Sequence, residues 1–193
     1  KDGLWLAELL KASGVNTGLI DRTGTVTGRA IIQVNSSGQN CIIINHGANG
    51  EITEEYIDNV LKHFHAGDIM LIQNEINSVP YIIDRAFDKG IKTVLNPSPI
   101  DSSILNSNLE KVAYFILNEI EGFRITREKK PDRIADALLA RYPEAKVVLT
   151  LGEKGVMYKD RETSYKHGIY KVPVVDTTGA GDTFTGYFLA CIT

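Results

Sequence analysis

Apolar residues follow different patterns before and after residue 50. In the first region, leucines at near-helical spacing predict an amphipathic helix over residues 3–13. Two apolar runs follow, at 28–35 and 39–45, and they flank the turn sequence Ser36-Ser37-Gly38. Because so short a connection cannot cross over, the two runs are predicted to pair as an antiparallel hairpin. We expect this hairpin to form a small unit of its own, over roughly residues 15–50.

From residue 50 onwards, helical and strand patterns alternate. Helices are predicted over 53–67, with Thr53 as the N-cap and Gly67 at the end, over 78–90, and over 131–142. The predicted strands are 68–73, 91–96, 111–118 and 145–152, followed by a β-rich stretch over 156–175 and a last helix. Apolar strands that alternate with helices predict an α/β fold with a mostly parallel sheet covered on both faces. Residues 1–14 and 51–193 would form this body.

Composition restricts the class of protein without naming its chemistry. The chain has 193 residues, is 43% apolar and 23% charged, and carries a formal net charge of −3. The negative balance argues against a nucleic-acid or acidic membrane surface as partner. No apolar run is long enough to span a bilayer, and the two cysteines do not form a disulfide framework. We therefore expect a cytoplasmic protein, and the apolar spacing that continues to residue 193 leads us to expect an internal part of a longer chain.

Polar or glycine-rich groups follow each predicted strand. The groups in question are Asn74 and Glu75, Asn96, Asn118 and Glu121, Thr150 with Gly152 and Gly155, and Asp176. In open parallel sheets, ligands bind at the carboxyl ends of the strands. Five successive strands with such endings therefore predict a binding site at one edge of the sheet.

The segment Gly179-Ala180-Gly181-Asp182 begins the last predicted helix. Free amides and the helix dipole at such a start form an anion site, and glycine lets a ligand approach the backbone closely. A carboxylate beside an anion site suits a general base that deprotonates a hydroxyl during phosphoryl transfer. The simpler alternative is that Asp182 only caps the helix.

Three further endings have both a functional and a structural interpretation. Glu121 follows Asn118 by three residues, so it could hold a hydrated Mg²⁺ or could simply favour a helix start. The stretch 150–155 offers a hydroxyl and two glycines to a nucleotide, or forms a β-turn. Glu75 could bind sugar hydroxyls or face solvent. The chain has no G-x-x-x-x-G-K-[ST] sequence, and Phe184 replaces the third glycine of a dinucleotide motif.

Taken together, these segments resemble the ribokinase-like (PfkB) carbohydrate kinases. "VVDTTGAGDTFTGYF" is similar to the family's C-terminal signature, and residues 27–49 are similar to its β lid. The segments "LIQNEI", "LNPSP", "ILNEIEGF" and "TLGEKGV" follow in the order of the ribokinase branch. The resemblance covers nearly the whole chain and implies a three-layer α/β/α fold with an antiparallel β lid over residues 15–50. It also implies that N- and C-terminal parts of the family fold lie outside these residues.

The resemblance assigns roles to individual residues. Asp182 would be the catalytic base and would also contact the substrate, and Glu75 would bind the sugar. The remaining assignments are an anion hole at Gly179, Ala180 and Gly181, nucleotide binding at Asn118, Thr150, Gly152 and Gly155, water-mediated Mg²⁺ binding at Glu121, and a K⁺ site at Asp176 and Thr178. The implied activity is transfer of the γ-phosphoryl group of ATP to a pentose, D-ribose first, with Mg²⁺ and K⁺. Another sugar or nucleoside, or ligand binding without catalysis, stays open, as does a homodimer through the β lid.

Overall fold

The computed structural model describes residues 2–22, 26–34, 40–173 and 177–193. The α-helices are α1 Asp2–Ala12, α2 Glu54–Leu61, α3 Val79–Asp88, α4 Ser102–Leu105, α5 Glu119–Thr126, α6 Pro131–Arg141 and α7 Ala180–Ile192. The strands are β1 Arg29–Val34, β2 Asn40–Asn45, β3 Ile69–Gln73, β4 Lys92–Asn96, β5 Tyr114–Asn118, β6 Lys146–Thr150, β7 Val156–Lys159 and β8 Ser164–His167. Short 3₁₀ turns lie at Gly47–Gly50, Leu109–Lys111 and Gly152–Lys154. The alternation expected after residue 50 is confirmed.

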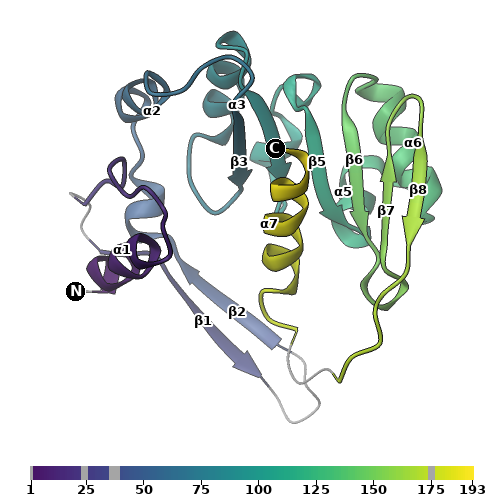
Figure 1. The fold of residues 1–193 in the computed structure, drawn as a ribbon, viewed down its shortest axis with the longest axis horizontal. Coiled ribbons are helices and arrows are strands. Elements are labelled where there is room, and N and C mark those ends of the chain that lie inside the picture. Colours follow the sequence, from purple (N-terminus) through teal and green to yellow (C-terminus); the bar gives the residue numbers. More distant parts are fainter. Residues whose placement is uncertain (1, 23–25, 35–39, 174–176) are drawn as a thin grey trace.

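The body of the protein is a six-stranded sheet in the order β3-β4-β5-β6-β7-β8 (Figure 1). Neighbouring strands from β3 to β6 are parallel, whereas β7 and β8 continue the sheet as an antiparallel hairpin. Parallel neighbours need crossover connections, and successive right-handed crossovers in one direction place their helices on one face. The mostly parallel α/β sheet expected from the sequence is therefore confirmed.

That face of the sheet carries the larger core. Fully buried side chains of the strands, including Phe115 and Leu149, pack against Ile83 of α3 and Ile134 of α6. Burying side chains of this size removes each from water at a gain of about 1.5–3 kcal/mol. Tyr142, after α6, stacks on Phe115 with a centroid separation of 5.5 Å. This core holds the strands in register and so holds their carboxyl ends level.

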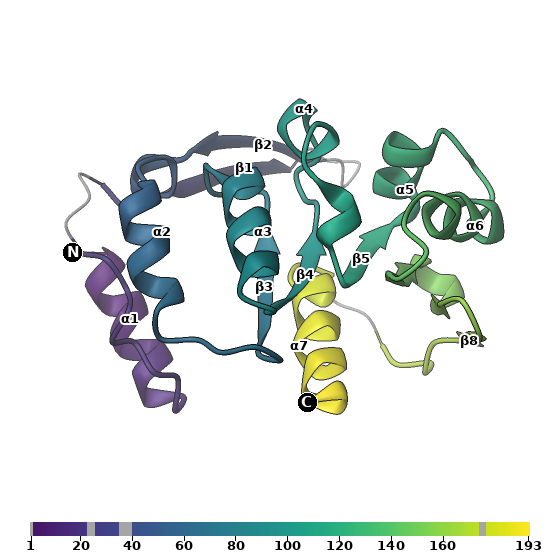
Figure 2. The same ribbon diagram turned by 90° about the horizontal axis from the view of Figure 1, so that it is seen from above.

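The opposite face is covered by α7, as Figure 2 shows. Val94, Ile116 and Val148 form a smaller buried cluster there, against which Phe184 and Phe188 of α7 pack. The Phe188 ring also meets Tyr114 edge to face, with centroids 6.2 Å apart. Side chains two residues apart in a strand share a face, so the residues that follow these three at i+2 point to the α7 side as well.

The hairpin β1–β2 forms a separate two-stranded sheet that pairs with no described strand of the larger one (Figure 1). The antiparallel register places Ile31 opposite Ile43, as the sequence predicts. Both of these side chains are more than half exposed, and Ile32 and Ile44 on the other face are exposed too. The turn predicted at 36–38 lies outside the described residues.

Three predicted boundaries differ from the structure by three residues or more. Helix α2 begins after Thr53, whose side chain caps the Tyr56 amide, but it ends at Leu61 instead of reaching Gly67. There the amides of His63 and Phe64 turn back to carbonyls three residues earlier, and Asp68 accepts from the His65 amide. The strand predicted from residue 111 starts at Tyr114, after a 3₁₀ turn.

The third error concerns the stretch 156–175, which was expected to be β-rich up to its end. Strands stop at His167, and residues 168–173 are irregular and exposed, while 174–176 lie outside the described residues. Pro173 in this segment lacks a backbone donor for a strand ladder. The strand that was predicted to lead into Asp176 is therefore absent over residues 168–173.

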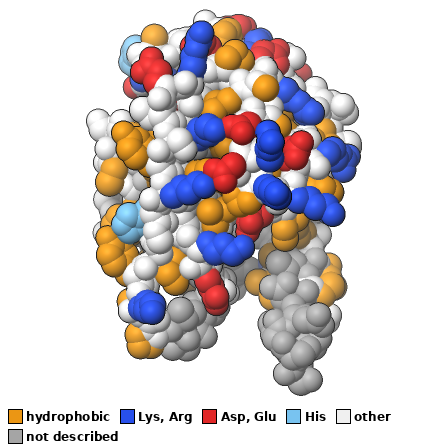
Figure 3. Space-filling view, turned by 90° about the vertical axis from the view of Figure 1, so that its right-hand side faces the viewer, with side chains coloured by type: hydrophobic (Ala, Val, Ile, Leu, Met, Phe, Trp, Pro, Cys, Tyr) orange, Lys and Arg blue, Asp and Glu red, His pale blue; other side chains and the backbone are white. Residues whose placement is uncertain are grey.

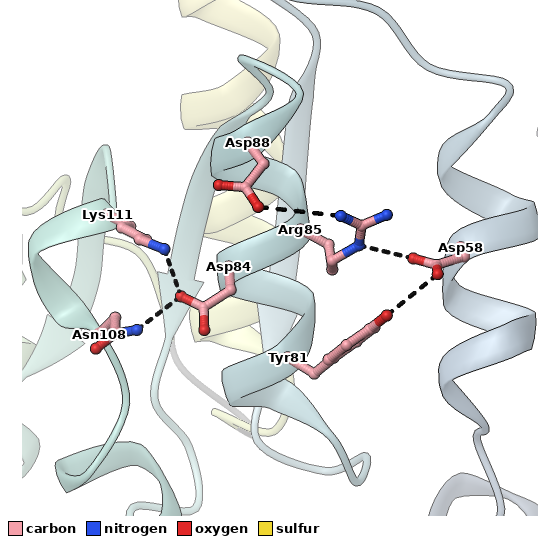
Figure 4. Close-up of polar contacts among 7 residues, drawn as sticks. All are labelled: Asp58, Tyr81, Asp84, Arg85, Asp88, Asn108 and Lys111. Atoms are coloured by element: carbon pink, nitrogen blue, oxygen red, sulfur yellow. Dashed lines mark hydrogen bonds and ion pairs between the residues drawn. The ribbon is translucent and has the colours of Figure 1, made fainter.

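Polar contacts link the outer elements to one another. Asp58 of α2 accepts from the Arg85 Nε atom at 2.8 Å and from the Tyr81 hydroxyl at 3.1 Å, both on α3 (Figure 4). The hydrogen bond from Arg85 lowers the pKa of Asp58. On the other side of α3, Asp84 accepts from Asn108 and Lys111, which lowers its pKa. These contacts orient α2 and the 3₁₀ turn at Leu109–Lys111 against α3.

A second set of contacts ties α6 to the β7–β8 hairpin. Lys159 pairs with Asp136, and Lys166 pairs with Asp132 at 2.7 Å. Figure 3 shows basic and acidic side chains interspersed on this side of the molecule, so no large area of one charge forms there. Exposed ion pairs of this kind contribute little individually to the free energy of unfolding.

The part of the chain that the structure describes contains no helix with the length and hydrophobicity of a membrane span.

The turn between β7 and β8 generates a testable pH dependence. Asp160 accepts from the Tyr158 hydroxyl at 2.6 Å, from the Thr163 amide at 2.7 Å and from the Glu162 amide at 2.9 Å, and the Tyr158 contact is the largest cause of a lowered Asp160 pKa. Asp160→Asn should lower the free energy of unfolding by about 1–2 kcal/mol near neutral pH.

A lowered pKa means that the carboxylate stabilises the fold above its ordinary value and that this contribution is lost as the pH falls through the folded-state value. The difference between Asp160→Asn and the unmodified protein should therefore shrink below about pH 4. Urea unfolding over a pH series measures it, with Glu162→Gln as the control from the same turn. If the difference in the free energy of unfolding stays constant down to pH 2, the Asp160 carboxylate is not the group responsible.

Candidate active site

The polar ends of four strands meet at one edge of the sheet. Gln73 of β3 pairs in register with Asn96 of β4, and Asn118 of β5 pairs with Thr150 of β6. Each of these residues lies two positions after a residue of the α7 face. Together with the start of α7 they surround an open cavity of about 180 Å³. Its lining is Gln73, Asn96, Ser98, Ile116, Leu117, Asn118, Glu121, Thr150, Gly179, Gly181, Asp182 and Thr185.

The start of α7 forms one wall of this cavity. Gly179 has φ +74°, the left-handed conformation that glycine adopts readily, and it precedes the first helical residue. Apart from the adjacent residues and the backbone of α7 itself, no heavy atom of the described residues lies within 4 Å of the position that a Cβ atom would take on Gly181. Gly179 and Gly181 are exposed, so a ligand can approach the backbone at the start of α7, where the helix dipole favours an anion. The Ala180 amide itself donates to the Thr177 carbonyl at 3.1 Å.

Asp182 lies in the first turn of α7, with an exposed side chain. Its Oδ1 atom accepts a hydrogen bond from Gln73 Nε2 at 3.4 Å. Asp182 is not the N-cap residue of its helix, because that position is Gly179. The Asp182 carboxylate lines the same cavity as Gly179 and Gly181, so a group that can accept a proton and an exposed stretch of glycine backbone share one cavity.

Asn118 and Glu121 form a capping box at the start of α5. Asn118 Oδ1 accepts from the amides of Ile120 and Glu121, and Glu121 Oε2 accepts from the Asn118 amide at 2.9 Å. Glu121 is 6% exposed, and its other oxygen accepts from the Ser98 hydroxyl. The structural interpretation of this pair is therefore correct, and the same two side chains still line the cavity.

The donor chemistry of this corner fits a hydrated magnesium ion. Mg²⁺ prefers oxygen ligands and keeps several of its waters, and Glu121, Asn118 and Thr150 all present oxygen atoms here. A carboxylate oxygen can accept more than one hydrogen bond, so Glu121 can serve metal-bound water as well as its cap. Within the described ranges, no group of three or more His, Cys, Asp or Glu side chains could enclose a metal directly.

The glycines that follow β6 are not part of the cavity lining, although Thr150 is. Gly155 has φ +93°, and a Cβ atom there would lie 1.9 Å from the His167 carbonyl oxygen. This glycine is therefore required by the close approach of the β8 end. Gly152 has φ +56° but open space around its Cβ position.

The other predicted residues either do not line the cavity or are not among the described residues. Glu75 follows β3 with an exposed side chain, does not line the cavity, and offers its carbonyl to the His46 ring at the base of the hairpin, 3.4 Å away. Thr178 lies in the turn before α7, and Asp176 lies outside the described residues. The sugar contact and the K⁺ site stay predictions.

Comparison of the sequence with known protein families explains why this cavity occurs in this fold. The profile of the "pfkB family carbohydrate kinase" group matches residues 3–193. The chain belongs to the pfkB family. It is 33% identical over 196 residues to a ribokinase of Staphylococcus aureus (strain COL), which covers 96% of this chain and 63% of the relative. It is also 30% identical over 186 residues to a deoxyribokinase of Salmonella typhi, covering 93% and 61%.

A solved structure of the same family has the same fold. The Arabidopsis thaliana ribokinase complexed with ribose and ATP superposes with a TM-score of 0.76 at 27% identity, over 100% of this chain and 65% of that one. The ribokinase-like α/β architecture with a small antiparallel sheet is thereby confirmed. The chain spans a little over three fifths of the length of these pfkB-family relatives.

Sequence reasoning missed three polar residues that line the cavity in this pfkB-family chain, namely Gln73, Ser98 and Thr185. Gln73 is the polar last residue of an apolar strand, and it lies two positions after Leu71, so both side chains point to the same face of the sheet. The alternation within this strand could therefore have indicated Gln73 as a cavity residue. Thr185 follows Asp182 by three residues, which places both on one side of the helix. It is 3% exposed, and its hydroxyl has no partner among the described residues.

The two glycines after β6 differ in a way that stability measurements can separate. Gly155→Ala should lower the free energy of unfolding by at least about 2 kcal/mol, because it combines a left-handed backbone with a backbone clash. Gly152→Ala should cost only about 1 kcal/mol, since it meets the backbone strain alone. Chemical denaturation of both variants tests this. Equal losses would show that packing against β8 does not require Gly155.

Proposed function

We propose that this protein is an ATP-dependent sugar kinase that phosphorylates the primary hydroxyl of a pentose. The observation that carries the proposal is the position of Asp182 beside the glycine-rich start of α7, in a cavity shared with the polar ends of four strands. Membership of a carbohydrate kinase family supports the reaction class.

In this proposal, the sugar hydroxyl oxygen attacks the γ-phosphorus of ATP in line with the bond to the leaving ADP. The proton of the hydroxyl passes to Asp182, so that a P–O bond forms as the β–γ bridge breaks. The amides of Gly179, Ala180 and Gly181 would stabilise the charge on the migrating phosphoryl group. Glycine at 179 and 181 lets that group come close to the backbone.

The nucleotide would lie at the β5–β6 side of the cavity. Asn118 and Thr150 would contact it, and Glu121 would hold Mg²⁺ through water. The ion, when bound, neutralises phosphate charge. Gly152 would contact the nucleotide through its backbone alone, and Gly155 would fix the shape of the turn that follows β6. We further propose that Asp176 and the Thr178 carbonyl hold K⁺ next to the anion site.

D-Ribose is the proposed sugar, phosphorylated at its 5-hydroxyl with Glu75 as a contact. The ribokinase relative and the structural neighbour that holds ribose and ATP support it. The deoxyribokinase relative at 30% identity favours 2-deoxyribose as the second candidate. An ADP-release assay on the full-length protein, with ribose, 2-deoxyribose, fructose and nucleosides, with and without K⁺, separates these substrates.

Asp182→Asn should reduce kcat for the best sugar by about 10²–10⁴-fold, because the isosteric amide cannot accept the proton. Sugar and nucleotide binding should persist. Coupled ADP release measures turnover and isothermal titration measures binding, with Asp132→Asn as a surface control. Unchanged turnover in Asp182→Asn would refute the mechanism. Sugar binding without ADP release in the unmodified protein would instead support a ligand-binding role.

We also propose that the β1–β2 hairpin joins two copies of the chain. A two-stranded sheet is marginal alone, and Ile31 and Ile43 expose 60% and 53% of their area on one face. Ile31→Lys should therefore convert a dimer into a monomer in light scattering after gel filtration. Ile120→Lys, at an exposed position on α5, is the control and should leave the dimer intact. An unmodified protein that is monomeric would exclude this interface.

A further inference from the structure

Gln73 is the last residue of β3, and its side chain donates a hydrogen bond to the Asp182 side chain. Its side chain is half-buried, lines the cavity, and points to the α7 face together with that of Leu71. The Nε2–Oδ1 distance is 3.4 Å. A long contact of this kind is typical of catalytic groups before substrate is bound.

The two residues differ in how firmly the fold holds them. Gln73 belongs to a strand whose register with β4 is set over five residue pairs, up to the pair with Asn96. Asp182 stands in the first turn of a helix, and its side chain is exposed. A hydrogen bond from a strand residue can fix such a side chain, because groups on regular elements are positioned more accurately than groups on loops and their rotamers can be held by supporting hydrogen bonds.

The charge of the donor also matters. Among the described residues that line the cavity, the titratable side chains are Asp182 and Glu121, and none is Lys, Arg or His. Both oxygens of Glu121 already accept hydrogen bonds from Ser98 and Asn118. Glu75, next to β3 in the chain, does not line the cavity. The only side-chain donor on Asp182 in this set is thus a neutral amide, which orients a carboxylate without pairing its charge.

We propose that Gln73 is a positioning residue that holds Asp182 Oδ1 and so turns Oδ2 towards the substrate hydroxyl. This role rests on the proposed kinase function. A misplacement of about 1 Å at a reacting group can cost on the order of 10²-fold in rate. The expected effect is therefore on kcat and not on the affinity for either substrate.

Two substitutions in the full-length protein test the role. Gln73→Glu keeps the shape but replaces the donor by a second carboxylate, so kcat should fall about 100-fold or more. Gln73→Met removes the donor without adding charge and should lower kcat about 10-fold. The KM values for sugar and ATP should stay within about threefold in both variants. Leu71→Gln, on the same strand and face, should leave kcat unchanged.

Thermal unfolding of each variant, compared with the unmodified protein, shows whether the fold is kept, and Gln73→Met keeps the test valid if Gln73→Glu does not fold. A kcat at the unmodified level in Gln73→Met would overturn the inference. A raised sugar KM with unchanged kcat would also overturn it, because Gln73 would then be a substrate contact. Asp182→Asn is assayed in parallel. If it remains active, the proposed function fails; if it is inactive while the Gln73 variants are normal, only this inference fails.

Discussion

The packing of α7 against one face of the sheet is the interaction on which the candidate site depends. Phe184 and Phe188 are partly buried and pack against the buried side chains of Val94, Ile116 and Val148. Full burial of a large apolar side chain contributes about 1.5–3 kcal/mol. Those three strand residues are followed at i+2 by Asn96, Asn118 and Thr150. The apolar contact therefore places the N-terminus of α7 directly against the polar strand ends. A substitution that weakens this packing would move Asp182 away from the rest of the cavity, even with every polar residue of the site unchanged.

The cavity also shows how the same side chains can support the fold and the chemistry. Asn118 and Glu121 satisfy amides at the start of α5, and Ser98 joins the loop after β4 to the same carboxylate. A capping interaction of this type contributes about 1 kcal/mol. A carboxylate held in this way loses little further freedom when water or a metal hydrate binds, which favours a pre-organised site. Structural and functional readings of such a pair are therefore not alternatives.

Much of the body could be predicted because the pattern and the sheet share one geometry. Apolar runs broken by helical periods dictate parallel strands with crossovers, and parallel strands bring their carboxyl ends to one edge. The convergence of Asn96, Asn118 and Thr150 follows from this rule. One error arose where two local signals compete. Gly67 is a valid helix stop, but Asp68 accepts from the His65 amide, and α2 ends a turn and a half earlier.

The sequence by itself determined the order of elements, the face to which each strand residue points, and the presence of a carboxylate at the glycine-rich start of the last helix. These properties depend on residues a few positions apart, so local periodicity and backbone preferences are enough to specify them. Tertiary structure alone decided that Gln73 contacts Asp182, 109 residues away in the chain, and that Gly155 must be glycine because the His167 carbonyl approaches it. Such contacts depend on the relative placement of distant elements, which the packing of the two sheet faces sets and which no local pattern contains.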